Sequence, residues 1–310
     1  MGKIVDIYTN GFLQRFNYDP AVPYYNCTDF EGLHQEKYSF LNDLSVRIAY
    51  FAYYYDGHRT DKVIFFCPGI GPGHRSYLAE IEALCRHGFK VFTIDYMGCG
   101  ESGGDDLFSI NQPYTDVINL LDQLAFREEL IIVGHSLGAY TALSTINKMS
   151  TVHKAIIISG FLSITNEVIG FAKLHFLAKM ILKHEERINP KYSHPHNWDY
   201  LKNANDKLLF IHSKDDPIVN YRYNTKRVQR IKNPNLSFYI CNGKKHNPTY
   251  TKEAANNSLK LMDTYNKKVA NGSFKSEEDK INYFKDVSLA KLTEQDQEVL
   301  KIIFDYIDKE

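Results

Sequence analysis

The segment LIIVGHSLGAYTAL, residues 130–143, places a serine where a short apolar run gives way to a helix-forming sequence. Ser136 has Gly134 two positions before it and Gly138 two positions after it. A serine lifted above a sheet edge takes a strained backbone conformation, and neighbouring chain then passes too close for a Cβ at either glycine. The spacing G-x-S-x-G therefore predicts a sharp strand-to-helix turn that presents the Ser136 hydroxyl beside the positive end of a helix.

Short apolar runs rich in Ile, Val and Phe recur along the chain, at 62–67, 90–95, 130–134, 154–159, 207–212 and 236–241. Runs of this kind are typical of strands that are covered on both faces. Helix-like segments such as 76–88 and 114–126 lie between them. The alternation predicts an α/β fold in one domain, residues 1–310, with a mostly parallel sheet flanked by helices. Residues 38–55 indicate earlier, antiparallel strands at one edge.

The composition excludes several classes of partner. Lys+Arg and Asp+Glu both total 37, so no net charge attracts nucleic acid. We find neither a run of roughly 18 apolar residues nor a secretory signal, and therefore expect no transmembrane segment. The five cysteines are scattered and form no C-x-x-C pair, which favours reduced thiols in the cytoplasm over a disulfide framework or a zinc site.

A glycine-rich loop after the first of these runs invites a different interpretation. FFCPGIGPGHRSY, residues 65–77, is followed by a second strand that ends at Asp95, which is the layout of a dinucleotide-binding unit. The G-x-G-x-x-G fingerprint has Gly69 and Gly71, but His74 occupies its last position. Two prolines also remove backbone donors from the loop, so we disfavour nucleotide binding.

A nucleophilic serine needs a base, and the base needs an acid that orients it. In this topology both follow later strands, in the order Ser, Asp, His. His246 stands in the loop after the last expected strand, and Asp215 and Asp216 follow the strand before it. The alternatives are a solvated loop histidine and, for Asp216, a turn residue before Pro217.

With these residues in place, the chain resembles the α/β-hydrolases, and within them the branch of monoacylglycerol lipases and serine-aminopeptidase-like esterases. The resemblance covers roughly 62–160 and 208–251. It is carried by residues 68–104 with the D-x-x-G-x-G-x-S segment that ends at Ser102, by VGHSLG, by HSKDDPIV and by NGKKHN.

The resemblance implies a serine mechanism without cofactor or metal. Ser136 would attack an acyl carbonyl, His246 would transfer the proton, and Asp216, with Asp215 as second choice, would orient the imidazole. The backbone N–H groups of Ile70 and Leu137 would form the oxyanion hole.

Three residues of this region bear on the resemblance. Pro68 stands where the branch usually has histidine, so other groups must hold the oxyanion loop in place. His74 is a candidate, the alternative being an exposed histidine at a helix start. Cys99 lies in a segment that is buried in relatives, and we interpret it as structural.

Residues 163–206 are too long for a simple connection between strands and predict an inserted cap, hereafter the cap segment. Residues 166–184 predict one amphipathic helix, with Lys173, Lys179 and Lys183 opposite an apolar face of Ile169, Phe171, Leu174, Phe176, Leu177, Met180 and Ile181. That face either packs on the protein's own core or roofs a substrate pocket. The cluster His184, Glu185, His194 and His196 suggests a polar cap surface rather than a metal site.

Two features follow the last strand. Residues 266–292 are strongly charged, and we interpret them as a surface loop or extension. The final helix has an apolar stripe from Leu300 to Ile307, and Thr293-x-x-Asp296 resembles a capping box before it.

The leading hypothesis is a hydrolase of small-molecule esters with an acyl-chain or aromatic acid part. A thioesterase, an acyltransferase or an N-terminal peptidase would use the same triad, the peptidase with Glu167, Glu185 or Glu186 as an anchor for a substrate amine. A ligand-binding protein that has lost catalysis is the alternative from another class.

Overall fold

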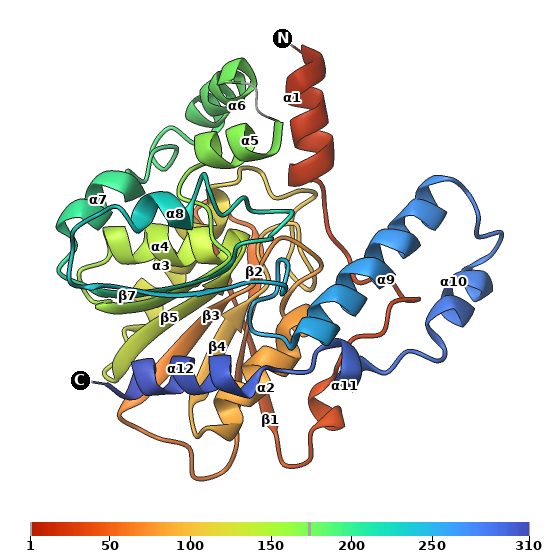
Figure 1. The fold of residues 1–310 in the computed structure, drawn as a ribbon, viewed down its shortest axis with the longest axis horizontal. Helices are drawn as coiled ribbons and strands as arrows, with labels where there is room; N and C mark the ends of the chain where they lie inside the picture. The colour runs from red at the N-terminus through yellow and green to blue at the C-terminus, as the bar shows by residue number, and fades with distance from the viewer. Residues whose placement is uncertain (1, 173–174, 310) are drawn as a thin grey trace.

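The computed structural model describes residues 2–172 and 175–309, and its centre is an eight-stranded sheet with the order β1-β2-β4-β3-β5-β6-β7-β8 (Figure 1). Strands β3 to β8 pair in parallel, whereas β2 runs antiparallel to both β1 and β4. The strands are β1 His34–Leu41, β2 Arg47–Tyr54, β3 Lys62–Cys67, β4 Lys90–Ile94, β5 Glu129–His135, β6 Lys154–Ile158, β7 Lys207–Ser213 and β8 Leu236–Cys241. The α/β fold and the antiparallel edge expected from the sequence are confirmed.

The helices connect and flank these strands (Figure 1). Short turns of other helical types are η1 Thr9–Leu13, η2 Cys27–Asp29 and η3 His74–Tyr77. The α-helices are α1 Gly2–Tyr8, α2 Leu78–Arg86, α3 Gln112–Leu124, α4 Leu137–Lys148, α5 Ile164–Ala172, α6 His175–Ile188, α7 Asn197–Asn203, α8 Thr225–Val228, α9 Lys252–Ala270, α10 Glu277–Phe284, α11 Leu289–Leu292 and α12 Gln297–Asp308.

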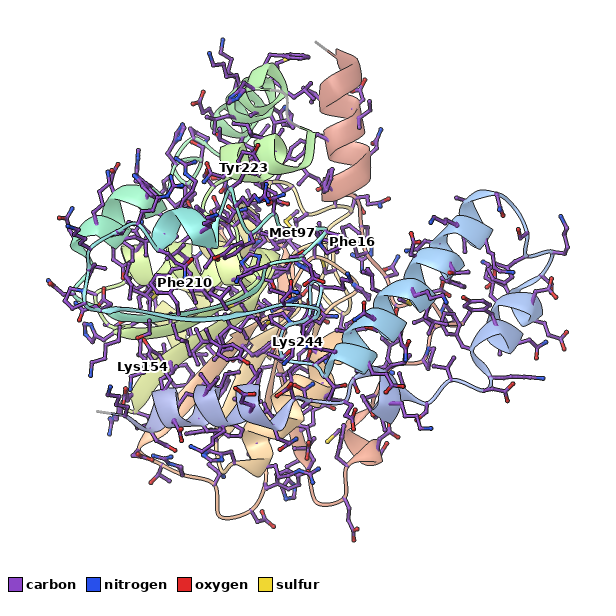
Figure 2. The ribbon with its side chains drawn as sticks, viewed as in Figure 1. Phe16, Met97, Lys154, Phe210, Tyr223 and Lys244 are labelled. Carbon is purple, nitrogen blue, oxygen red and sulfur yellow. The ribbon has the colours of Figure 1, made fainter. Side chains whose placement is uncertain are left out.

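Each face of the sheet has its own apolar core, which explains why the strands are continuous apolar runs. Ile131 and Val133 of β5 point to the face covered by α2 and α12, and Ile132 points to the face covered by α3 and α4. Phe210 of β7 is buried on the same face as Ile132 (Figure 2). Successive strand residues alternate between the faces, so a strand needs apolar residues at every position when both faces are buried.

Helix α12 is tied to the sheet by two buried lysines. The Nζ atoms of Lys62 and Lys154 each donate a hydrogen bond to the carbonyl of Ile307, at 2.9 and 3.1 Å (Figure 2 labels Lys154). Carbonyl groups at a helix C-terminus have no partner within the helix and carry partial negative charge, so lysine stabilises them. The helix begins after Asp296, whose side chain accepts from the N–H groups of Glu298 and Val299. Asp296 is therefore the N-cap, and the capping box expected at Thr293 is wrong.

The cap segment contains α5, α6 and α7 between β6 and β7, and α5 and α6 lie beyond the sheet beside α1 (Figure 1). The single helix expected over 166–184 is wrong, because α5 and α6 are separate helices that pack against each other. Lys173, Leu174 and the side chain of Phe171 lie outside the described residues. Of the rest of the expected apolar face, Ile181 is buried and Phe176 is 55% exposed.

Glu185 of α6 joins the cap segment to the body of the protein, so its expected place on a polar surface is wrong. Its side chain is fully buried and accepts hydrogen bonds from Tyr8 Oη at 2.7 Å, Ser109 Oγ at 2.5 Å and Asn111 Nδ2 at 2.9 Å. These partners belong to α1 and to the segment that precedes α3. A buried carboxylate is stable only with several donors of this kind, so the network holds three distant segments together.

Residues 266–292 are largely helical rather than a loop. They include the end of α9 and all of α10 and α11. The end of α9 and α10 project from the body of the protein, whereas α11 lies beside it (Figure 1). Ser276 caps α10 through a reciprocal capping box with Asp279. The charged character that suggested a loop is accounted for by exposed helix faces.

The buried carboxyl group of Asp116 in α3 makes the stability of the fold depend on pH. Its Oδ1 accepts from Asn42 and Gln112, whereas Oδ2 is buried with no hydrogen-bond partner among the described residues. Burial raises the pKa of Asp116 to about 7. A raised pKa favours the protonated group in the folded state, so this contribution is complete below about pH 4 and declines as the pH rises to about 7.

Asp116→Asn is expected to stabilise the protein at pH 8 by up to about 4 kcal/mol and to change stability little near pH 4, because a shift of about three pKa units corresponds to that energy. Urea unfolding at both pH values measures the difference. Asp122→Asn, on the exposed side of the same helix, is the control. Equal effects of Asp116→Asn at the two pH values would contradict the assignment.

Candidate active site

The parallel strands direct the predicted site residues to one edge of the sheet. Ser136 follows β5, Asp216 follows β7, His246 follows β8, and Ile70 lies in the loop after β3. Carboxyl ends of parallel strands meet at one edge, where ligands bind in folds of this type. Four segments that are distant in sequence therefore meet around one site.

Ser136 lies at the sharp turn that the glycine spacing predicts. Its backbone has φ 57° and ψ −119°, a left-handed conformation that is strained for serine, and α4 begins at the next residue. A Cβ at Gly134 would overlap with the carbonyl of Gly138, and a Cβ at Gly138 would overlap with the carbonyl of Cys67. The expected steric reason for both glycines is therefore confirmed.

His246 and Asp216 form a buried hydrogen-bonded pair. Nδ1 of His246 lies 2.8 Å from Oδ2 of Asp216, and the Asp216 side chain is fully buried. Oδ1 of Asp216 accepts from the N–H groups of Ile218 and Val219, at 2.8 and 3.0 Å. Burial by itself would raise the pKa of Asp216, but His246 and His212 outweigh it, and the pKa is lowered. Asp216 is thus held as a carboxylate with a fixed orientation.

Asp215 has a different set of partners. Its carboxylate accepts hydrogen bonds from Ser213 Oγ and from the N–H of Gly243, and it pairs with Lys245 at 2.9 Å. Although burial opposes it, these contacts lower the pKa of Asp215 to about 2. The structure therefore brings Asp216, and not Asp215, to His246.

The loop that carries His246 is held in place by contacts of Lys244 and of the His246 backbone. Lys244 is almost fully buried, and its Nζ donates to Asp296 at 2.6 Å and to the carbonyl of Pro248 at 3.2 Å (Figure 2). On the other side, the carbonyl of His246 lies 2.8 Å from Nε2 of His135, the residue before Ser136. The imidazoles of His135 and His246 are 4.6 Å apart between centroids. His246 is therefore held beside the turn that carries Ser136.

The loop after β3 also lies close to Ser136. A Cβ at Gly69 would lie 3.3 Å from the Cβ of Ser136 and 3.3 Å from the carbonyl oxygen of His135, so the backbone of Gly69 lies close against the Ser136 turn. Tyr96 Oη donates to the carbonyl of Pro68 at 3.0 Å. This bond supports the loop at Pro68, the position where the serine-aminopeptidase-like branch usually has histidine. Ile70, the next residue after Gly69, thereby lies near the turn.

His74 is buried, so the alternative of an exposed histidine is wrong. Its Nδ1 and its backbone N–H lie 2.8 and 2.7 Å from Oδ1 of Asp95, and its ring stacks on Phe51. The other Asp95 oxygen accepts from the N–H of Glu101, and Cys99 between them is buried as expected. Asp95 thus joins the end of the glycine-rich loop after β3 to the turn after β4.

The sequence did not reveal three side chains that surround the pair. His212 places Nε2 3.0 Å from the carbonyl of Val219 and 3.3 Å from Asp216 Oδ2. Tyr77 places its hydroxyl 2.9 Å from Nδ1 of His135. Only adjacency to the motifs marks two of them: His135 precedes Ser136, and His212 lies one residue before the end of β7, four residues before Asp216.

Glu167 is an acidic residue of the cap segment whose pKa is affected by the charge of Asp216. Burial, and then the charge of Asp216, raise the pKa of Glu167 to about 8. Its Oε2 is buried with no hydrogen-bond partner among the described residues. Glu186, by contrast, pairs with His194 at the surface, at 2.7 Å.

A cavity of about 200 Å³ lies under the cap segment, lined by Tyr140, Leu162, Trp198 and other residues.

The described residues contain neither a helix long and apolar enough to cross a membrane nor a group of three potential ligands placed to hold a metal ion. All five cysteines are free.

Residues 58–201 match the family model described as serine aminopeptidase, S33. No curated protein matches the sequence. Among solved structures, the chain is similar to the Pyrococcus furiosus esterase Pf2001, with a TM-score of 0.57 and 17% identity over 77% of this chain and 91% of the esterase. It is also similar to mouse alpha/beta hydrolase domain-containing protein 10, with a TM-score of 0.51 and 19% identity over 76% and 99% of the two chains. At these identities the structures support the fold, and the family model supports the branch.

Proposed function

Because the chain belongs to the α/β-hydrolase superfamily, in its serine-aminopeptidase-like branch, we propose that it is a serine carboxylesterase with a triad of Ser136, His246 and Asp216. The observation that carries the proposal is the 2.8 Å hydrogen bond between His246 and a buried Asp216 carboxylate, in a loop held beside the Ser136 turn. An imidazole oriented by a carboxylate beside a strained serine is the arrangement that activates a hydroxyl nucleophile.

In the proposed reaction, Oγ of Ser136 attacks the ester carbonyl while Nε2 of His246 accepts its proton. The C–O bond to the alcohol then breaks, His246 protonates the leaving oxygen, and the acyl group remains on Ser136. Water releases the acid by the same steps. Asp216 accepts the Nδ1–H bond of His246, which fixes the tautomer and stabilises the imidazolium.

The proposed oxyanion hole consists of the backbone N–H groups of Leu137 and Ile70. Leu137 is the first residue of α4, where N–H groups have no partner within the helix and the helix end is positive. Gly69 brings the Ile70 loop against Ser136. A donor of this kind typically contributes about 3 kcal/mol of transition-state stabilisation.

We propose that the cap segment supplies the site for an acyl chain or an aromatic acid. The cavity beneath it borders Tyr140, one turn beyond Ser136 in α4, and the aromatic residue Trp198 of α7. The apolar part of the lining, which includes Leu162, Leu182 and Trp198, suits a lipophilic group. The rest of the lining is polar, with residues such as Asn166, Asp199 and Arg227. We also propose a cytoplasmic location, which the free cysteines favour, and a small-molecule ester as the substrate.

The direct test combines turnover with covalent labelling of the wild-type protein. A series of p-nitrophenyl esters graded by acyl length, with matching thioesters, should reveal hydrolysis with a preference for one length. A fluorophosphonate should inactivate the protein, and the label should map by mass spectrometry to the peptide that contains Ser136. Recovery of an intact bound ligand together with no turnover and no label would favour a non-catalytic binding protein instead.

Glu167 favours one second candidate function, the cleavage of substrates that carry an amine near the scissile carbonyl. Its Oε2 is buried with no hydrogen-bond partner among the described residues, and a substrate ammonium would supply the missing donor. The carboxyl group would be the charged partner of the ammonium once it is ionised, above its raised pKa of about 8. Glu167→Gln is then expected to raise KM for an aminoacyl ester by about 10- to 100-fold, the range of a charged hydrogen bond, and to leave KM for an uncharged acyl ester unchanged.

Glu186→Gln is the matched control, because Glu186 belongs to the same cap segment but pairs with His194 at the surface. It should affect neither substrate. If Glu167→Gln alters both esters equally, or neither, then Glu167 does not select amines, and the uncharged ester remains the proposed substrate.

A further inference from the structure

His135 lies at the junction of three segments that form the candidate site. It ends β5, and the residue is 7% exposed. Its Nε2 lies 2.8 Å from the carbonyl oxygen of His246, and its Nδ1 lies 2.9 Å from the hydroxyl of Tyr77. One imidazole therefore contacts both the loop of His246 and the segment that leads from the oxyanion loop into α2.

The chemistry of these contacts determines the tautomer of His135. A carbonyl oxygen can only accept a hydrogen bond, so Nε2 of His135 must carry the proton. In the neutral ring Nδ1 is then an acceptor, and the hydroxyl of Tyr77 must donate to it. Burial, followed by the adjacent His246, lowers the pKa of His135 to about 3, so the ring stays neutral when the enzyme works near neutral pH.

Tyr77 extends this contact to the oxyanion loop. A Cβ at Gly69 would overlap with the Tyr77 hydroxyl, so the hydroxyl lies directly against the backbone that precedes Ile70. The chain of contacts therefore runs from Gly69 through Tyr77 and His135 to the backbone of His246. Because His135 directly precedes Ser136, these contacts connect the Gly69 loop, the Ser136 turn and the His246 loop.

We propose that His135 is a positioning residue that sets the distance of the His246 imidazole from Ser136 and couples it, through Tyr77, to the oxyanion loop. The inference rests on the proposed function of Ser136 and His246. His135 acts through the backbone of His246 and does not touch the reacting atoms. A displacement of about 1 Å in a reacting group can lower a rate by about 100-fold, so loss of this contact should reduce the chemical step.

The test compares His135→Leu, which has a similar size but no donor, with His135→Gln, which keeps an N–H donor for the His246 carbonyl. His135→Leu is expected to lower kcat on a p-nitrophenyl ester by about 10- to 100-fold with KM within about twofold of wild type. The rate of fluorophosphonate inactivation should fall in parallel. His135→Gln should recover most of the activity at a Tm equal to that of His135→Leu. Equal activity losses in both variants at equal Tm would overturn the proposal, as would wild-type kcat in His135→Leu.

A measurement on the resting protein separates this inference from the proposed function. The low-field proton resonance of the His246–Asp216 hydrogen bond should be sharp in the wild type and broadened in His135→Leu. Absence of turnover and labelling in the wild type would refute the proposed function, whereas an unchanged resonance in the variant would refute the positioning role. If His135→Leu does not fold, Tyr77→Phe tests the same chain of contacts. Its kcat is expected to fall by about three- to tenfold. Wild-type kcat in Tyr77→Phe would refute the coupling to the oxyanion loop.

Discussion

Replacing Ser136 with alanine is expected to abolish ester hydrolysis, with kcat lowered by about 10⁶-fold, as when the nucleophile of a comparable triad is removed. Alanine removes the attacking oxygen but leaves the backbone turn, because it has the same Cβ and tolerates the φ of 57° no worse than serine. The remaining groups would still bind substrate, so the variant should retain the substrate affinity and the Tm of the wild type. Stopped-flow measurement of product release and fluorophosphonate labelling measure the loss.

Ser258→Ala serves as the control for Ser136→Ala. Ser258 is a partly exposed serine of α9, whose Oγ donates to the carbonyl of Ala255, and it has no place in the proposed triad or in the lining of the cavity. Its replacement should leave both turnover and labelling within about twofold of wild type. Labelling that persists in Ser136→Ala would place the nucleophile elsewhere and remove the basis of the proposed mechanism.

The predictable part of the structure is the part that local sequence patterns determine. Strand β3 begins and ends where its apolar run does, because both of its faces are buried and nearly every position must be apolar. Strand β8 also has the bounds of its run, although it lies at the edge of the sheet and only Leu236 in it is buried. The turn at Ser136 is equally local, since Gly134 and Gly138 are required by backbone contacts within a few residues and with β3. The order of Ser, Asp and His along a parallel sheet then brings the three loops to one edge.

The unpredicted part depends on contacts between residues that are far apart in sequence. The neighbouring residues predict a polar surface at Glu185, but Tyr8, 177 residues away, helps to bury it. The hydroxyl of Tyr77 reaches His135 across 58 residues, and no periodicity or motif indicates that pairing. Before α12, the sequence offers both Thr293 and Asp296 as possible N-caps. Asp296 caps the helix because its carboxylate accepts from two free N–H groups at once.

Asp216→Asn is expected to lower kcat by about 10⁴-fold, the loss seen when the acid of a serine triad becomes an amide. The structure provides a specific reason for the loss. Oδ1 of Asp216 is held by the N–H groups of Ile218 and Val219, so an asparagine would place its oxygen there and its NH₂ group toward His246. Nδ1 of His246 would then have to accept, which leaves the proton on Nε2, facing Ser136. That tautomer cannot take the serine proton.

Asp215→Asn tests whether this loss is specific to the acid that contacts His246. An asparagine at 215 can still accept from Ser213 and Gly243 through its oxygen, and loses only the charge that faces Lys245. Its kcat should therefore stay within about tenfold of wild type, since a partly exposed ion pair contributes little. Steady-state kinetics of both variants on one ester, with circular dichroism to compare their folding, measure the contrast. A larger loss in Asp215→Asn than in Asp216→Asn would mean that the carboxylates exchange roles during turnover, and the geometry of Asp216 would then no longer identify the acid of the triad.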